Sequence, residues 1–140
     1  MPHPINLSAA GVDLSARFFN STAVAASPSG TAETTVCTLT VTGDIAAVAG
    51  VYLFGTVAFT VAGSGTAATV KLRQTGTSGT TIYSTGALTT DTAALLVSHA
   101  VSGFDASPVL PGQVYVMTVT VASGSGASTV SAVNLIAVCV

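Results

Sequence analysis

Charged side chains are almost missing from this 140-residue chain. Lysine and arginine total three, aspartate and glutamate total five, and together they make up 6% of the sequence, against about 25% in an average globular domain. With so few cations and a pI near 5.3, the chain has no basic patch for binding nucleic acid or an anionic membrane surface. The composition therefore excludes both as partners.

Tryptophan is absent, and tyrosine and phenylalanine are few, yet the mean hydropathy is +0.75. Alanine, threonine, serine, glycine and valine supply the apolar excess. A monomer with so little surface charge is poorly soluble unless something else protects it. One explanation is a surface coated with threonine and serine hydroxyls. The one we favour is that copies of the chain, or a partner, cover much of the surface.

Long apolar runs and a recognisable targeting segment are also missing. The longest apolar run, Ile45 to Gly55, is far below the about 20 residues that a membrane-spanning helix needs. The first 19 residues lack the basic and apolar regions of a signal peptide. No membrane partner is expected.

Cysteine occurs only at Cys37 and Cys139, both in strand-like runs. Two buried thiols in a reducing compartment are the interpretation we favour, and a disulfide is the alternative. Two cysteines do not make a metal site.

From Thr22 onward the sequence predicts β-structure throughout. Threonine and valine are stiff, β-branched residues that favour strands, and turn signals such as "SPSG", "AGSG" and "ASGSGAS" recur at short spacing. Eight strands in two sheets is the count of a jelly roll, so we expect one all-β, eight-stranded antiparallel sandwich over residues 21–140. The expected strands are about 22–27, 33–42, 51–62, 67–74, 80–85, 93–100, 113–122 and 129–140.

The last expected strand is apolar on both faces. Val133, Leu135, Ala137 and Cys139 alternate with Asn134, Ile136, Val138 and Val140. A strand of this kind is either central in a sandwich or buried between subunits. We therefore expect one face in the core and an oligomer interface formed by Ile136, Val138 and Val140, with "ASGSGAS" as the hairpin before this strand.

The first 20 residues differ from the rest, because they hold two prolines and the one segment that suggests a short helix, Asp13 to Phe19. We interpret them as an arm that docks on a capsid or a neighbouring subunit; the alternative is a terminus packed on its own domain. The expected contact residues are Ile5, Leu7, Val12, Leu14, Phe18 and Phe19.

Residues that commonly act in catalysis, such as histidine, aspartate and glutamate, are too few to indicate an active site. The nucleophile elbow G-x-S-x-G does not occur, and "GSGTAATVK" lacks the G-K-[ST] of a phosphate loop. His99 has no second ligand at a helpful spacing. Lys71 and Arg73 share one strand face, where they either solvate it, as we favour, or pair with acids of another copy or partner. No catalytic residue, metal ligand or cofactor is predicted.

Two blocks resemble small structural proteins of tailed bacteriophages. These are "ATVKLRQTGTSGTTIYSTG", from Ala68 to Gly86, and "PGQVYVMTVTVASGSGASTVSAVNLIAVCV", from Pro111 to Val140. The resemblance covers about the last 90 residues and rests on structural motifs. It implies a jelly roll of the tumour-necrosis-factor or C1q-like kind, often trimeric, with the first and last strands side by side and Cys37 near Cys139.

The function that this resemblance implies is head decoration. The chain is expected to be a non-enzymatic homotrimer on the exterior of the virion, made in the bacterial cytoplasm, that binds the major capsid protein and stabilises the lattice. The alternatives are a receptor- or glycan-binding head of a tail fibre or spike, and, least favoured, an enzyme. The three tyrosines offer little material for the aromatic platforms of a sugar site.

Overall fold

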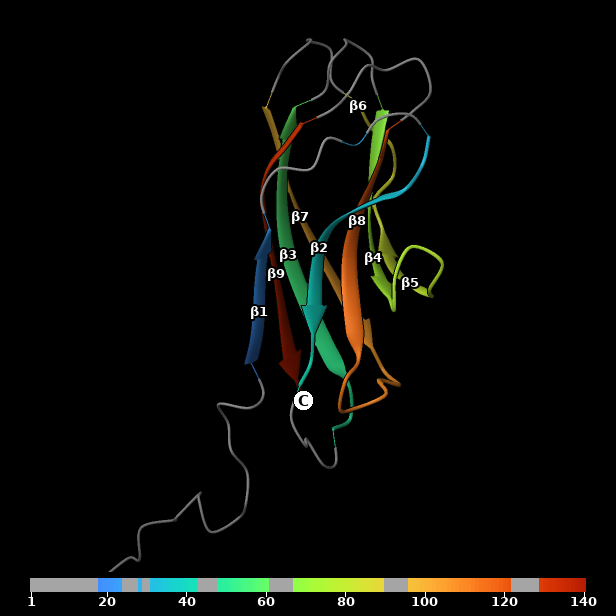
Figure 1. Ribbon diagram of the computed structural model, residues 1–140, viewed down its shortest axis with the longest axis vertical. Helices are drawn as coiled ribbons and strands as arrows, with labels where there is room; N and C mark the ends of the chain where they lie inside the picture. The colour runs from blue at the N-terminus through green and yellow to red at the C-terminus, as the bar shows by residue number, and fades with distance from the viewer. Residues whose placement is uncertain are drawn as a thin grey trace, which may run out of the picture.

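A computed structural model of the chain describes residues 18–23, 28, 31–42, 48–60, 67–89, 96–121 and 129–140. Its regular structure is entirely β-strand (Figure 1). Among these residues no helix is long and apolar enough to cross a membrane. The strands are β1 (Phe18–Ala23), β2 (Thr34–Thr40), β3 (Val51–Thr60), β4 (Ala67–Gln74), β5 (Thr81–Ser84), β6 (Leu88–Thr89), β7 (Leu96–Asp105), β8 (Val114–Val121) and β9 (Thr129–Cys139).

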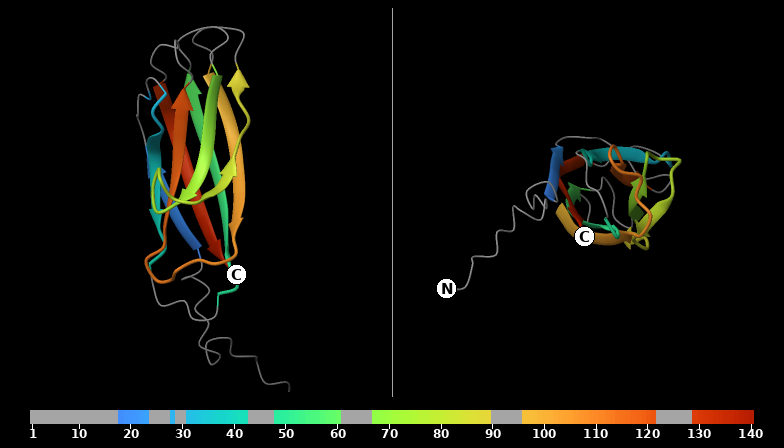
Figure 2. Two further views of the ribbon diagram at one scale, coloured as in Figure 1. Left: turned by 90° about the vertical axis from the view of Figure 1, so that its right-hand side faces the viewer. Right: turned by 90° about the horizontal axis from the view of Figure 1, so that it is seen from below.

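The strands form two antiparallel sheets that pack face to face. One sheet has the order β1-β9-β3-β7 and the other β2-β8-β4-β5, with the short β6 beside β4. Seen end on (Figure 2, right), β1 and β2 meet at one margin of the sandwich. At the other margin β5 contacts β7. The expected all-β sandwich is confirmed.

The strand order is that of a jelly roll. Successive strands lie in opposite sheets, except where β4 leads into its neighbours β5 and β6, and the first and last strands, β1 and β9, are paired. This strand order shows that the prediction of a hairpin at "ASGSGAS" is wrong. Because β8 and β9 belong to different sheets, this segment connects the two layers, although its residues lie outside the described part of the chain.

The first strand also begins earlier than predicted, at Phe18. Phe18 and Phe19, expected at the end of a short helix, are extended residues of β1 and pair with Val138 and Ala137 of β9. Seven residues hold a helix poorly without tertiary support, whereas adjacent aromatic residues suit a pleated surface. The prediction of a helix is therefore wrong for Phe18 and Phe19. The remaining positions of the predicted helix, 13–17, are not among those described.

The core lies between the sheets and follows the predicted alternation. On β9 the side chains of Val133, Leu135, Ala137 and Cys139 are buried, and their neighbours point outward. On β8 both faces are covered, because Val116 and Thr118 are buried on the outer side. The largest fully buried side chains are Tyr115, Phe59, Leu53, Leu72, Met117 and Leu135.

Both cysteines lie in this core, and neither forms a disulfide. The Cys37 thiol donates to the backbone oxygen of Ser21 over 3.7 Å, which ties β2 to β1 at the margin of the sandwich. Burial raises the pKa of Cys37, so the thiol stays protonated and unreactive. The interpretation as buried thiols is supported.

Candidate functional interface

The outer face of the β1-β9-β3-β7 sheet carries a row of large apolar side chains. Phe18 of β1 pairs with Val138 of β9, Val138 pairs with Tyr52 of β3, and Tyr52 pairs with Phe104 of β7. The register therefore lines up four apolar residues across all four strands. In Figure 1 this end of the sheet is the lower one, where the label C marks the terminus.

A second row lies directly beside the first, because side chains two residues apart point to the same face. It consists of Asn20, Ile136, Phe54 and Ser102, taken in strand order. Val140 continues β9 beyond the first row and exchanges backbone hydrogen bonds with Gly50. The two rows and Val140 are called the aromatic face below.

The aromatic face is exposed to an unusual degree for large apolar groups. Phe18 is 64% exposed, Phe54 47%, and Tyr52 and Phe104 44% each. The ring of Tyr52 lies 4.6 Å from that of Phe104 and 6.3 Å from that of Phe54, centroid to centroid, so these three rings form one contiguous cluster. A contiguous apolar patch of this kind on a soluble protein marks an interaction site.

The rest of this sheet face is neutral. In the described parts of β1, β3, β7 and β9, the outward positions beyond the aromatic face hold alanine, serine, threonine, asparagine and one leucine. One polar atom there, Oδ1 of Asn134, is buried without a hydrogen-bond donor. A surface of this composition suits contact with another uncharged surface.

The opposite sheet carries the charges. Glu33, just before β2, accepts hydrogen bonds from the guanidinium of Arg73 at 2.5 and 2.8 Å and from Nζ of Lys71 at 3.2 Å. The hydroxyl of Thr118 also donates to it. The two cations were expected to solvate their strand face, and this is wrong, because both pair with an acid of their own chain. The cluster covers Thr118 on the outer side of β8.

The environment of Glu33 makes the fold acid-sensitive. The hydrogen bond from Arg73, helped by Thr118 and Lys71, lowers the pKa of Glu33 from 4.5 to about 2, against the opposing effect of burial. A carboxyl whose pKa is lower in the folded state stabilises the fold above its unfolded pKa and loses that contribution as the pH falls. Since its side chain is 15% exposed, the contribution is on the order of 2 kcal/mol.

We therefore expect the free energy of unfolding to fall between pH 4.5 and pH 2. Urea titrations across this range measure it, and the variant Glu33→Gln is the control, because it removes the titrating group and keeps the shape. The variant should be less stable at pH 6 and should lose less stability on acidification. Parallel pH curves for the two proteins would contradict the assigned role of Glu33.

A second polar cluster joins the two sheets at the end that carries the aromatic face. Asp105, the last residue of β7, is 5% exposed. Its Oδ2 accepts hydrogen bonds from the Tyr115 hydroxyl at 2.8 Å and from Nε2 of Gln74 at 2.6 Å, and its Oδ1 accepts the amide of Ser107 at 3.0 Å. Burial and the neighbouring carboxylate raise the pKa of Tyr115 above its usual range, so the phenol remains a donor. The cluster is a satisfied structural network.

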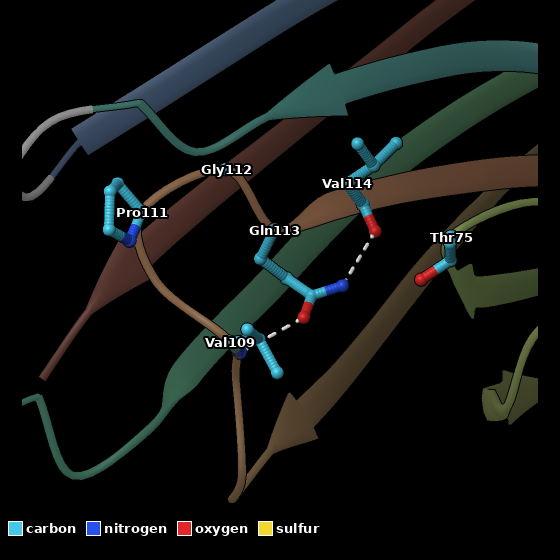
Figure 3. A pocket seen from close by; sticks show the side chains of 6 residues that line it. All are labelled: Thr75, Val109, Pro111, Gly112, Gln113 and Val114. Atoms are coloured by element: carbon cyan, nitrogen blue, oxygen red, sulfur yellow. Dashed lines mark hydrogen bonds between the residues drawn. The ribbon is translucent and has the colours of Figure 1, made fainter.

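A shallow pocket of about 250 Å³ opens beside this cluster, between the β7–β8 and β4–β5 connections. Figure 3 shows the Gln113 side chain, whose Oε1 accepts the amide of Val109 and whose Nε2 donates to the oxygen of Val114, both at 3.0 Å. Both the oxygen and the nitrogen of the amide group are thus engaged in holding the loop. The remaining lining, Thr75, Pro111 and Gly112, offers no charged group to a ligand.

The predicted interface residues are brought together in part. Ile136, Val138 and Val140 lie on the aromatic face, as does Phe18 from the expected arm. Phe19 points inward and packs against the core. The other expected arm residues, Ile5, Leu7, Val12 and Leu14, lie outside the described part of the chain.

Sequence reasoning missed Tyr52, Phe54 and Phe104 as interface residues. Tyr52 and Phe54 alternate with buried Val51, Leu53 and Gly55 in β3, so their outward direction was visible in the sequence. Their clustering with Phe104, on the same sheet face as Phe18, was not, because it depends on which strands are neighbours. His99 lies partly buried on β7, and the described residues hold no group of three His, Cys, Asp or Glu side chains suited to a metal.

No family model and no curated protein matches the sequence, whereas solved structures match its fold. The VP2 subviral particle of infectious bursal disease virus matches at 14% identity with a TM-score of 0.54. The structure of the Gx strain of this virus gives the same values, and a mutant VP2 protein in derived T=1 particles gives 13% and 0.55. Each match covers 88% of this chain and 32% of the viral one. The chain thus spans about a third of the length of these viral proteins, and at this identity it shares with them the jelly-roll fold.

Proposed function

We propose that the chain is a non-enzymatic structural component of a virus particle, of the head-decoration (cement) kind. The aromatic face carries this proposal, because a neutral sheet face with exposed rings is built for a protein contact. The jelly-roll likeness to VP2 in its subviral and T=1 particles supports a viral setting. The resemblance to tailed-bacteriophage proteins adds the finer assignment to the outside of a bacteriophage head.

The mechanism of stabilisation is mass action. A subunit that binds the assembled lattice and not its dissociated parts shifts the equilibrium toward the lattice by RT ln(1 + [L]/Kd). A homotrimer would present three copies of each contact to the major capsid protein, so weak single contacts combine into tight binding. In this proposal residues 1–17, which precede the first strand, reach the capsid.

The described polar groups are consistent with this role. Glu33 pairs with both Lys71 and Arg73, which leaves one positive charge in that cluster, and Asp105 is used in joining the sheets. Such groups stabilise a thin two-layer fold that must survive outside a cell. They leave the neutral face as the surface with the greatest capacity for binding.

The proposal predicts that the chain is present in purified particles. Particles of the virus that encodes it, purified on a density gradient, would be analysed by quantitative mass spectrometry against the major capsid protein. We expect copies on the order of the number of lattice positions, and removal of the chain by mild denaturant should lower the temperature at which the particles release their genome. Absence of the chain from intact particles would overturn the proposal.

A receptor- or glycan-binding head is the second candidate. The adjacent rings of Tyr52 and Phe104 favour it, since sugars stack on exposed aromatic platforms. A glycan array separates the candidates, because a decoration protein has no need to bind a sugar.

A further inference from the structure

We infer that the occupant of the aromatic face is another copy of this chain. This inference deepens the proposed function, because it names the partner that binds to the same face. It rests on the proposed function only in taking this face as a protein contact. It excludes a charged partner surface and a glycan as the principal ligand. The argument uses the area of the face, its charge and its shape.

The area is sufficient for a specific interface. A phenylalanine or tyrosine side chain contributes about 150–250 Å² when fully buried, and the four rings are about half exposed. They would therefore bury roughly 400 Å² per copy, half of the about 800 Å² per partner in a standard interface. The neutral remainder of the face, together with Ile136, Val138 and Val140, supplies the rest.

The charge distribution favours a copy over a different protein. A partner with a charged surface would have to desolvate those charges against rings that cannot pair with them. A second aromatic face carries no charged groups, so its burial has no such desolvation cost. The net charge of −2 adds little repulsion between copies.

The shape of the face also suits self-association. Sheets pack face to face at about 10 Å with their strands inclined by roughly 30°, and the outer face of β3 and β9 is available for this packing. The clustered rings of Tyr52, Phe54 and Phe104 lie on the internal strand β3 and on the neighbouring edge strand β7. Buried aromatic residues in such a position are the usual hot spots of an interface.

Sedimentation velocity of the full chain tests the inference. We expect an oligomer at concentrations on the order of 10 μM, corresponding to a binding free energy of about −7 kcal/mol or stronger. The variant Tyr52→Lys/Phe54→Lys should raise the dissociation constant at least 100-fold, since two hot-spot side chains are lost and two charges would be buried. The matched control Thr38→Lys/Thr40→Lys adds the same charges to exposed positions of β2, and it should associate as the unmodified chain does.

Two further measurements test whether the variants are folded and whether charge pairs hold the contact. Circular dichroism shows whether each variant is folded, and the milder Phe54→Ser is used if the double lysine variant is not. Raising the salt concentration from low to high should leave the association unchanged or tighter, because no charge pair holds it. Association that weakens steeply with salt would overturn the inference.

The outcomes separate this inference from the proposed function. A monomeric unmodified chain, or equal loss of association in the face variant and the β2 control, overturns the inference whatever the particle analysis finds. Glycan binding that the face variant abolishes in a monomeric chain assigns the face to a sugar and also overturns it. An oligomer held by this face in a chain absent from particles leaves the inference standing and removes the proposed function.

Discussion

Replacing Asp105 with alanine is expected to lower the free energy of unfolding by about 3 kcal/mol, because a buried donor and a partly buried donor lose their acceptor. The Tyr115 hydroxyl and the Gln74 amide both donate to Oδ2 of Asp105, and Tyr115 is fully buried. Alanine leaves a buried hydroxyl without a partner, at a cost of roughly 1–3 kcal/mol for each such group. Thermal denaturation should show a decrease in Tm of about 10 °C.

The variant Tyr115→Phe provides the matched control. It removes the donor together with the need to satisfy it, and it keeps the ring that fills the core, so we expect a smaller loss of about 1–2 kcal/mol. The double variant Asp105→Ala/Tyr115→Phe should be more stable than the sum of the single losses predicts, because the two residues interact directly. Strict additivity would show that the 2.8 Å contact contributes nothing to stability.

This network also positions the aromatic face. Asp105 is the residue after Phe104, and its bonds to β4 and β8 fix the end of β7 against the opposite sheet. Phe104 in turn lies against Tyr52. Loss of the carboxylate is therefore expected to loosen one ring of the interface as well as the fold.

The fold was predictable because its signals are local. Alternation with a period of two marks each long strand directly in the sequence, as in Cys37, Leu39 and Val41, which are all buried. The start of β1 was placed four residues too late, because Phe18 and Phe19 were assigned to the end of the expected helix. β6 has two residues, too few for any periodic pattern.

The interactions between strands were not predictable, because they join residues far apart in the chain. Glu33 meets Lys71 and Arg73 across 38 and 40 positions, and nothing near Glu33 in the sequence identifies its partners. The hydrogen bond that Asp105 accepts from the Ser107 amide is local and typical of an aspartate in a turn. Its contacts with β4 and β8 depend on sheet order, which a single sequence leaves open.

The last strand offers the second prediction of large effect, since its neighbouring residues Leu135 and Ile136 face opposite ways. Leu135 is fully buried between the sheets, and Leu135→Ala should cost about 3 kcal/mol through lost burial and the cavity that remains. Ile136 lies on the outer face, and Ile136→Ala should cost less than about 1 kcal/mol in dilute solution. Urea unfolding at low protein concentration measures both.

The same pair behaves differently once the aromatic face is occupied. Ile136→Ala should weaken self-association several-fold, because the side chain lies between Asn20 and Phe54 in the second row, whereas Leu135→Ala acts through stability alone. Comparing unfolding at low and high protein concentration separates the two effects, since association adds about RT ln(1 + [L]/Kd) to the stability of the folded state. If the stability of the Ile136→Ala variant rises with concentration as steeply as that of the unmodified chain, then the outer face of β9 takes no part in the contact. A shallower rise places this uncharged last strand in both the core and the interface, which would explain why neither of its faces carries a charge.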